Sequence, residues 1–304
     1  MVKKVPLQVS GVMLGMAALG HLLQSYGGAF RVLCGVLAAF LFCLVLCKLI
    51  MHPGMIRQDL KDPVLAGFAA TYPMGMMVLS AQCKSVFGKT AYYLWLLAIA
   101  LQIALIVYYS MRFVKKKLDL RKVSTVWYIV YVGIACAGVT ASAFGKHTVG
   151  AVAFWLGLIA FLPLLYFVNQ RYAKIPAPES MRPLIGICAM PMSLCAAAYV
   201  QSAKAVNLPF LLTMLAIATV LYVYAFAKVF EQLKAPFEPN CAAYTFPFVI
   251  SALATKLTMT WATNAGHELL FLKPVVHFET AVAVLLVVYI YIRFMLQLRG
   301  RREE

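Results

Sequence analysis

Few side chains of this chain have the types and spacing that metal binding or catalysis requires. The five histidines form no HxxxH or HExxH pair, the spacings typical of zinc sites on helices. The eight cysteines form no CxxC pair and lie almost entirely in apolar stretches, where cysteine usually acts as a small buried hydrophobe in a reducing compartment. The apolar stretches hold no carboxylate pair and no Ser/His/Asp set. The sequence therefore predicts no metal, no cofactor and no enzymatic activity.

Lys256 is the one basic residue that lies well inside an apolar stretch. Ionisable groups at membrane depth are candidates for function, so Lys256 could raise the electrostatic potential at the mouth of a pore. It could also extend its ammonium group to the membrane interface, or pair with Glu268 or Glu279. The sequence leaves these alternatives open.

The elements that position such residues are ten apolar stretches, each long enough to span a bilayer as a helix. Short loops and longer loops alternate between them, which predicts five helical hairpins in one transmembrane domain over residues 1–304. The stretches are 5–24, 29–51, 64–82, 89–112, 123–143, 148–170, 180–200, 207–232, 243–263 and 276–299.

Charge indicates how the chain is inserted. The net charge is +17, which in a soluble chain would suggest nucleic-acid binding. Here 20 of the 27 Lys and Arg fall on the side that also holds both termini. Positive residues gather on the cytoplasmic side of membrane proteins. We therefore expect a multi-pass protein of the plasma or bacterial inner membrane, with both termini cytoplasmic and no nucleic-acid partner.

The odd-numbered stretches differ in composition from the even-numbered ones. The odd stretches carry eight glycines and five prolines, against three and two in the even stretches. Small residues permit close helix approach, and helices that line a cavity tolerate kinks. This favours five odd helices inside five even ones, around a central pathway. The alternative is that glycine and proline only allow tight packing.

Three prolines of the odd stretches are candidates for shaping such a pathway. Pro73, Pro191 and Pro247 would each remove a helix hydrogen bond and bend the helix. The alternative is a tolerated kink without ion contact. Small or polar residues of the same stretches are possible pore-lining or mouth positions, together with Lys256: Gly15, Gly75, Gly133, Ser193 and Thr245.

Four segments resemble the tellurite-resistance/dicarboxylate transporter family, which includes the bacterial tellurite-resistance permease, yeast malate and sulphite transporters and the slow anion channel of plant guard cells. The most specific is 237–250 (FEPNCAAYTFPFVI), which is similar to the ninth-helix signature of the family. The others are 5–20 (VPLQVSGVMLGMAALG), 127–134 (WYIVYVGI) and 189–193 (AMPMS).

The resemblance implies ten helices in five hairpins around a pseudo-five-fold axis, with odd helices lining a pore in each subunit of a homotrimer. It also implies that Phe246 plugs the pore at mid-membrane. Phe246 lies only about four residues into the stretch 243–263. Either this helix starts nearer Asn240 and kinks at Pro247, or the gate lies nearer the cytoplasm than the resemblance implies; we favour the first.

Two functions follow from this interpretation. The first is an anion channel for small monovalent anions, closed by Phe246. Without a ring of fixed charges, selectivity would follow dehydration cost, so that nitrate or iodide passes better than chloride. The alternative is a secondary transporter or exporter of C4-dicarboxylate, sulphite or tellurite-type oxyanions. Coupling usually requires a titratable group in the membrane, and the odd stretches offer no mid-span Asp or Glu.

Overall fold

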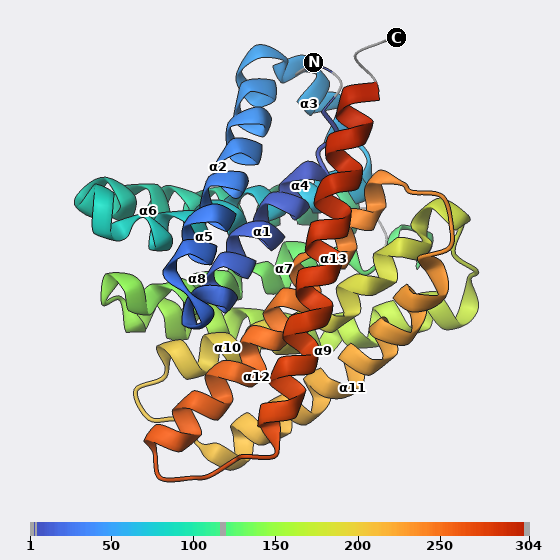
Figure 1. Ribbon diagram of the computed structural model, residues 1–304. Coiled ribbons are helices and arrows are strands. Elements are labelled where there is room, and N and C mark those ends of the chain that lie inside the picture. The colour runs from blue at the N-terminus through green and yellow to red at the C-terminus, as the bar shows by residue number, and fades with distance from the viewer. Residues whose placement is uncertain (1–2, 4, 116–119, 301–304) are drawn as a thin grey trace.

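The computed structural model describes residues 3, 5–115 and 120–300, and these residues form helices and no strand (Figure 1). Five of the basic residues counted above as inner lie outside the described residues, namely Lys4, Lys116, Lys117, Arg301 and Arg302.

The helices fall into long α-helices and short helical turns. In chain order, the α-helices are α1 (Val9–Leu23), α2 (Gly28–Met51), α3 (Pro53–Asp59), α4 (Pro63–Ala69), α5 (Thr71–Gln82), α6 (Lys84–Tyr109), α7 (Val126–Tyr131), α8 (Cys136–Ala141), α9 (His147–Lys174), α10 (Met190–Ser202), α11 (Leu208–Gln232), α12 (Phe246–Asn264) and α13 (Leu272–Gly300). The 3-10 turns are η2 (Gln24–Tyr26), η4 (Leu120–Lys122), η5 (Val132–Ala135), η6 (Ser142–Phe144), η7 (Glu179–Ala189) and η8 (Pro239–Tyr244), and η3 (Ser110–Val114) is a π-helical turn.

Nine helical segments of the described residues are long and apolar enough to cross a membrane. The protein is therefore an all-helical, multi-pass membrane protein. The expected first span, 5–24, corresponds to α1, which has 15 residues. That is about 22 Å at ~1.5 Å per residue, less than the roughly 30 Å of a hydrocarbon core. A tenth span stays a prediction.

Burial divides the membrane segments into two sets. We call α1, Pro63–Gln82, Val126–Phe144, Glu179–Ser202 and Pro239–Asn264 the odd segments, and α2, α6, α9, α11 and α13 the even helices. Between 72% and 94% of the most apolar window of the last four odd segments is buried, against 22% to 33% for the segments that contain the even helices. In α1, all residues except His21 and Leu23 are buried. The even helices thus present apolar side chains to the surroundings and cover the odd segments.

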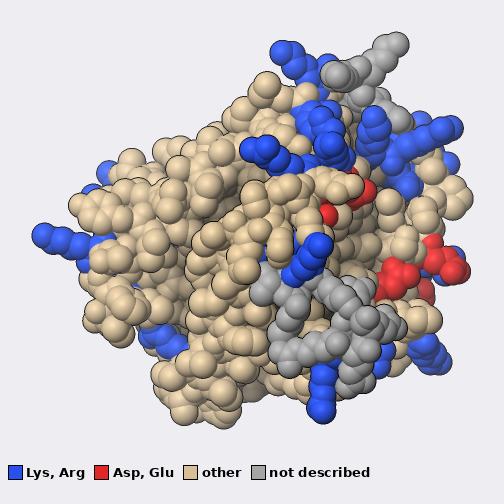
Figure 2. All heavy atoms as spheres, turned by 90° about the horizontal axis from the view of Figure 1, so that it is seen from above, with Lys and Arg blue, Asp and Glu red and all other residues tan. Residues whose placement is uncertain are grey.

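Charged side chains are absent from a broad band of the surface shown in Figure 2. Lys, Arg, Asp and Glu crowd one side of this view, and a few Lys and Arg mark the opposite edge. An uncharged belt between two charged edges is what a protein surrounded by lipid presents.

Four of the odd segments are interrupted near their middle. α4 gives way to α5, α7 to α8 through η5, η7 to α10, and η8 to α12. Pro73, Pro191 and Pro247 lie within the first three residues of α5, α10 and α12. A proline in the first turn of a helix removes no intrahelical hydrogen bond. The prolines therefore fit the start of the second helix in each segment.

Hydroxyl groups satisfy backbone carbonyls at these interruptions. The Thr245 hydroxyl lies 2.8 Å from the Ala242 carbonyl, and the Ser193 and Ser251 hydroxyls lie 2.8 and 3.0 Å from the Ala189 carbonyl. Thr71 donates to the carbonyl of Phe68 at 2.7 Å. Backbone N–H groups also donate to two of these carbonyls, Thr245 N–H to Ala242 and Ala70 N–H to Phe68, so the hydroxyls add a second donor where the helices are interrupted.

Some glycines are needed because helices cross at close range. A Cβ atom on Gly138 would lie 2.8 Å from the Ala198 Cβ and 3.0 Å from the Gly150 carbonyl oxygen. A backbone atom of a neighbouring helix cannot move aside as a flexible side chain can. The crossing of α8, α9 and α10 therefore depends on small residues.

We expect Gly138→Ala to reduce the free energy of unfolding by about 1–3 kcal/mol, as overpacking does. The midpoint of thermal unfolding of the purified protein in detergent measures this. Gly54→Ala is the matched control, because a Cβ at Gly54 meets nothing within 4 Å. An equal midpoint for the two variants would contradict the close crossing.

Candidate functional site

Two cavities lie along the centre of the odd segments. The wide cavity has a volume of about 270 Å³, and the narrow cavity one of about 10 Å³. A cavity needs about 10–15 Å³ to hold one water molecule, so the narrow cavity is a constriction. Phe246 lines both cavities and thus stands between an open space and a closed one.

All five odd segments contribute to both cavities. The narrow cavity is lined by their first halves and by the residues that start the second halves: Gly11, Phe68, Thr71, Ile129, Ile187, Met190, Ala242, Ala243, Phe246 and Pro247. The wide cavity is lined towards their C-terminal ends: Ala18, His21, Gln24, Val78, Ala81, Gln82, Cys136, Val139, Thr140, Ser142, Ala143, Leu194, Gln201, Phe246, Ile250 and Leu253. Arg31 of α2 joins the wide cavity, and it is the one described lining residue from an even helix.

Phe246 is held at the interruption of its segment. It is the first residue of α12 and only 4% exposed. The preceding residue, Thr245, has φ −92° and ψ −88°, outside the helical range, and its hydroxyl lies 3.0 Å from the carbonyl of Gly11. The segment Pro239–Asn264 begins with η8, and α12 follows from Phe246. The interruption between them falls at Thr245, two residues before Pro247. Phe246, which lines both cavities, thus follows directly after the break in the backbone.

Helix N-termini converge beside Phe246. The first residues of α5, α8, α10 and α12 are Thr71, Cys136, Met190 and Phe246, and each lines one of the cavities or both. The N-terminus of a helix carries a partial positive charge and unpaired N–H groups. Among the described residues, no Asp or Glu lines either cavity. The path therefore favours negative ions without a ring of charged side chains.

The glycines expected as lining residues pack against neighbouring helices instead. A Cβ on Gly15 would lie 2.6 Å from the Cβ of Thr245 and 3.0 Å from the backbone nitrogen of Phe246. Gly75 faces the side chain of Met13, and Gly133 faces Met74. Of the three, Gly15 matters most for the site, because it allows α1 to support the interruption behind Phe246.

Ser193 and Thr245 also lie behind the path. The Ser193 hydroxyl lies 3.0 Å from the Ser251 hydroxyl, between α10 and α12. The Thr245 hydroxyl donates to the Ala242 carbonyl. Neither residue is among those that line the cavities. Of the three prolines, Pro247 lines the narrow cavity, and Pro73 and Pro191 do not line either cavity.

Lys256 lies at the C-terminal end of α1. Its ammonium group donates to the Leu22 carbonyl at 2.6 Å and to the Ser25 hydroxyl, and lies 5.2 Å from the centre of the Tyr26 ring. No ion pair joins it to Glu268 or Glu279 within the described residues. A cation there compensates the negative end of a helix dipole. Lys256 does not line the wide cavity.

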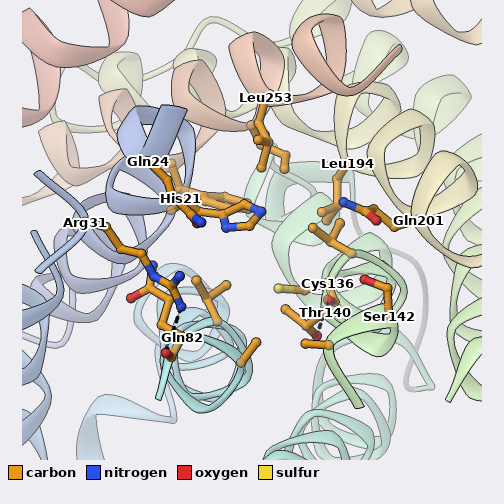
Figure 3. A pocket seen from close by; sticks show the side chains of 17 residues that line it. His21, Gln24, Arg31, Gln82, Cys136, Thr140, Ser142, Leu194, Gln201 and Leu253 are labelled. Atoms are coloured by element: carbon orange, nitrogen blue, oxygen red, sulfur yellow. Dashed lines mark hydrogen bonds between the residues drawn. The ribbon is translucent and has the colours of Figure 1, made fainter. Parts of the chain in front are cut away.

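The wide cavity has a polar rim that the sequence analysis missed. His21, Gln24 and Arg31 lie on one side of the cavity in Figure 3, and Ser142 and Gln201 lie on the other. Arg31 comes from an even helix, for which the composition argument predicts a peripheral position. The close contact at Gly20, whose Cβ would lie 3.2 Å from the Arg31 carbonyl, brings the start of α2 against α1. That contact depends on three-dimensional packing and leaves no simple sequence signal.

Comparison with known proteins gives one match. The model of the SLAC1 family, described as voltage-dependent anion channel, matches residues 4–296 of this chain. No curated protein matches.

The asymmetry of the path can be tested with a negatively charged methanethiosulfonate reagent on the purified protein. We expect Gln201→Cys, at the rim of the wide cavity, to add one modified thiol relative to wild type. We expect Ala242→Cys, at the narrow cavity, to add none, because the reagent cannot enter about 10 Å³. Intact mass measures both.

Combining Ala242→Cys with Phe246→Ala provides the control, because it should expose the new thiol. Equal modification of Ala242→Cys and Gln201→Cys in the presence of Phe246 would contradict the constriction.

Proposed function

Because this chain belongs to the SLAC1 family of voltage-dependent anion channels, we propose that it conducts small monovalent anions through a pore within each subunit, closed by the ring of Phe246. Family membership confirms the resemblance found in the sequence. It also makes the chain an anion channel and not an enzyme. The pathway, its gate and its selectivity are the proposal, and the position of Phe246 between the wide and narrow cavities is the observation that carries it.

The proposed architecture has ten spans in five hairpins around a pseudo-five-fold axis, within one transmembrane domain over residues 1–304. The support is that five odd segments line both cavities and that the even helices are exposed. In this architecture α1 crosses the membrane together with the residues that precede it.

The proposed gate works by excluding water. An aromatic ring across a narrow apolar passage forces an anion to lose its hydration shell. Most of the neighbouring lining residues, such as Ile187 and Met190, are apolar, and the hydroxyl of Thr71 already donates to the Phe68 carbonyl, so they offer little replacement. Movement of the Phe246 ring would join the two cavities, and the N-termini of α5, α10 and α12 would then face the passing anion.

We further propose a homotrimer with both termini cytoplasmic, in the plasma or inner membrane. The charge distribution supports this topology, because 20 of the 27 Lys and Arg lie in segments on the side of the termini. The support for a trimer is the expectation from the family resemblance.

A proton-coupled transporter of dicarboxylate, sulphite or tellurite fits the site less well. Coupling usually requires a titratable group in the membrane part of the path. His21 lines the wide cavity at its rim and does not line the narrow cavity. Glu279 is the buried carboxyl within a membrane segment, at 2% exposure. It belongs to α13 and does not line either cavity, so its protonation would not meet the transported ion.

Replacing the gate residue tests the proposal. We expect Phe246→Ala to increase anion current in oocytes or planar bilayers by about tenfold or more, since each ~1.4 kcal/mol taken from a barrier is a factor of ten in rate. Phe248→Ala is the matched control. Phe248 is fully buried two residues away, its ring packs on Tyr222 at 5.3 Å, and it does not line either cavity.

A current that rises in Phe246→Ala, stays unchanged in Phe248→Ala and reverses at the anion equilibrium potential would support the gate. Equal currents in wild type and Phe246→Ala would place the barrier elsewhere. Saturable, pH-dependent uptake of a labelled dicarboxylate, without current, would favour the transporter.

The permeability order is a separate prediction. With fixed dipoles and no ring of acidic or basic side chains at the constriction, dehydration cost should dominate. Reversal potentials of Phe246→Ala in mixed salts should therefore give permeabilities of iodide and nitrate above that of chloride. Chloride ahead of iodide would indicate a binding site that replaces the hydration shell at the constriction.

A further inference from the structure

We propose that the polar rim of the wide cavity is a recognition site for planar oxyanions, nitrate and carboxylate, with the guanidinium of Arg31 as its principal ligand. The rim consists of His21, Gln24, Arg31, Ser142 and Gln201. The interpretation of this rim as the entry site for permeating anions rests on the channel proposed above.

The rim presents donors that the protein itself does not use. In the described part of the chain, the side chains of His21, Gln24, Ser142 and Gln201 have no hydrogen-bond, ring or ionic partner. An imidazole carries at least one N–H, and an amide carries two. In Figure 3 these side chains come from opposite sides of one cavity. A ligand in the cavity therefore meets unpaired donors on both sides.

The guanidinium of Arg31 is held in place on one edge only. Its Nη2 donates to the carbonyl of Gln82 at 2.8 Å, and the Gln82 amide in turn donates to the carbonyl of Ala17 at 2.6 Å. No other partner engages the Arg31 guanidinium within the described residues. Because a guanidinium has five N–H donors, four remain available. A positioned but mostly unpaired guanidinium is a pre-organised anion ligand.

The charged side chain at the rim, Arg31, is positive, and no negative side chain lies beside it among the described lining residues. Arg31 lies beside His21, and its positive charge acts on that ring. The ion pairs among the described residues join other groups: Lys48–Asp59, Arg182–Glu179 and Lys228–Glu231. No Asp or Glu is among the described lining residues. Without a carboxylate from the protein, the rim is complemented by an anion from solution.

The shape of the guanidinium selects among anions. Its planar fork can donate two parallel hydrogen bonds to two oxygens of a carboxylate or nitrate. A halide is a single spherical acceptor and cannot use both bonds in this way. The wide cavity is also lined by Leu194, Ile250 and Phe246, which offer no polar contact. Recognition at the rim is thus separate from the dehydration that the constriction imposes.

Arg31→Lys is the sharpest test, because it keeps the charge and removes the fork. We expect sodium nitrate and sodium acetate, compared with sodium chloride at equal ionic strength, to raise the midpoint of thermal unfolding of the purified protein. The lysine variant should bind both oxyanions about tenfold more weakly, so that most of this difference disappears. Lys256→Gln is the matched control, because it removes a nearby charge outside the cavity and should retain the difference.

His21→Leu provides a second variant, because it removes the N–H donor, and should weaken oxyanion binding with Arg31 intact. Size-exclusion chromatography establishes that each variant is folded. If wild type, Arg31→Lys and Lys256→Gln respond equally to nitrate and acetate, the proposal is wrong, and the salts act on the protein in general.

Currents separate this proposal from the proposed channel. In the Phe246→Ala background, Arg31→Lys should lower the permeability of nitrate relative to iodide, an anion that also dehydrates easily but has no planar oxygens. An unchanged nitrate-to-iodide ratio would overturn the proposal while leaving the channel intact. If no variant conducts but the Arg31-dependent oxyanion binding persists, the recognition site stands and the proposed channel fails.

Discussion

The constraint on which this structure depends is that a polypeptide in a membrane must satisfy its own backbone hydrogen bonds. The even helices meet it with uninterrupted membrane stretches of apolar residues. The odd segments are interrupted, and they meet it with short turns whose backbone groups stay paired, as Thr245 N–H does with the Ala242 carbonyl, and with added hydroxyl donors: Thr245 at the Ala242 carbonyl, and Ser193 and Ser251 at the Ala189 carbonyl. Ser193 and Thr245, which the sequence suggests as pore lining, thus lie behind the cavities, at the interruptions where Phe246 and the helix N-termini line them.

The same constraint explains the division between the two sets of helices. An interrupted segment can be stable only where neighbouring helices supply partners, so it must be buried. In Glu179–Ser202, 94% of the most apolar window is buried. Burial at close range then requires small residues. Gly15 beside Thr245, and Gly138 beside Ala198, occupy positions where any larger side chain would move the helix that carries the site. The glycine-rich composition of the odd segments, their burial and their interruptions therefore all follow from the need to satisfy backbone hydrogen bonds within the membrane.

Much of this was predictable from the sequence, and the exceptions have physical causes. The motif around Phe246 identified the family because a Thr-Phe-Pro run encodes a break followed by a helix start. Hydropathy places the start of that segment at residue 243, whereas the structure begins it at Pro239, because Pro239 and Asn240 lower the local hydropathy although the rest of the 3-10 turn is buried. Pro247 was expected to mark the kink; the break falls at Thr245, since proline fits the first turn of the new helix.

Arg31 shows the limit of composition as a guide. It was assigned to a peripheral helix, yet its side chain reaches the wide cavity because α1 and α2 touch at Gly20. A membrane protein that selects anions has two separate tasks: it must attract and identify the ion while water is still present, and it must then remove that water. Charged groups serve the first task well but would trap the ion in the second. In the proposed channel, a guanidinium at the hydrated rim, and mostly apolar residues and helix dipoles at the constriction, would let both tasks proceed in sequence along one path.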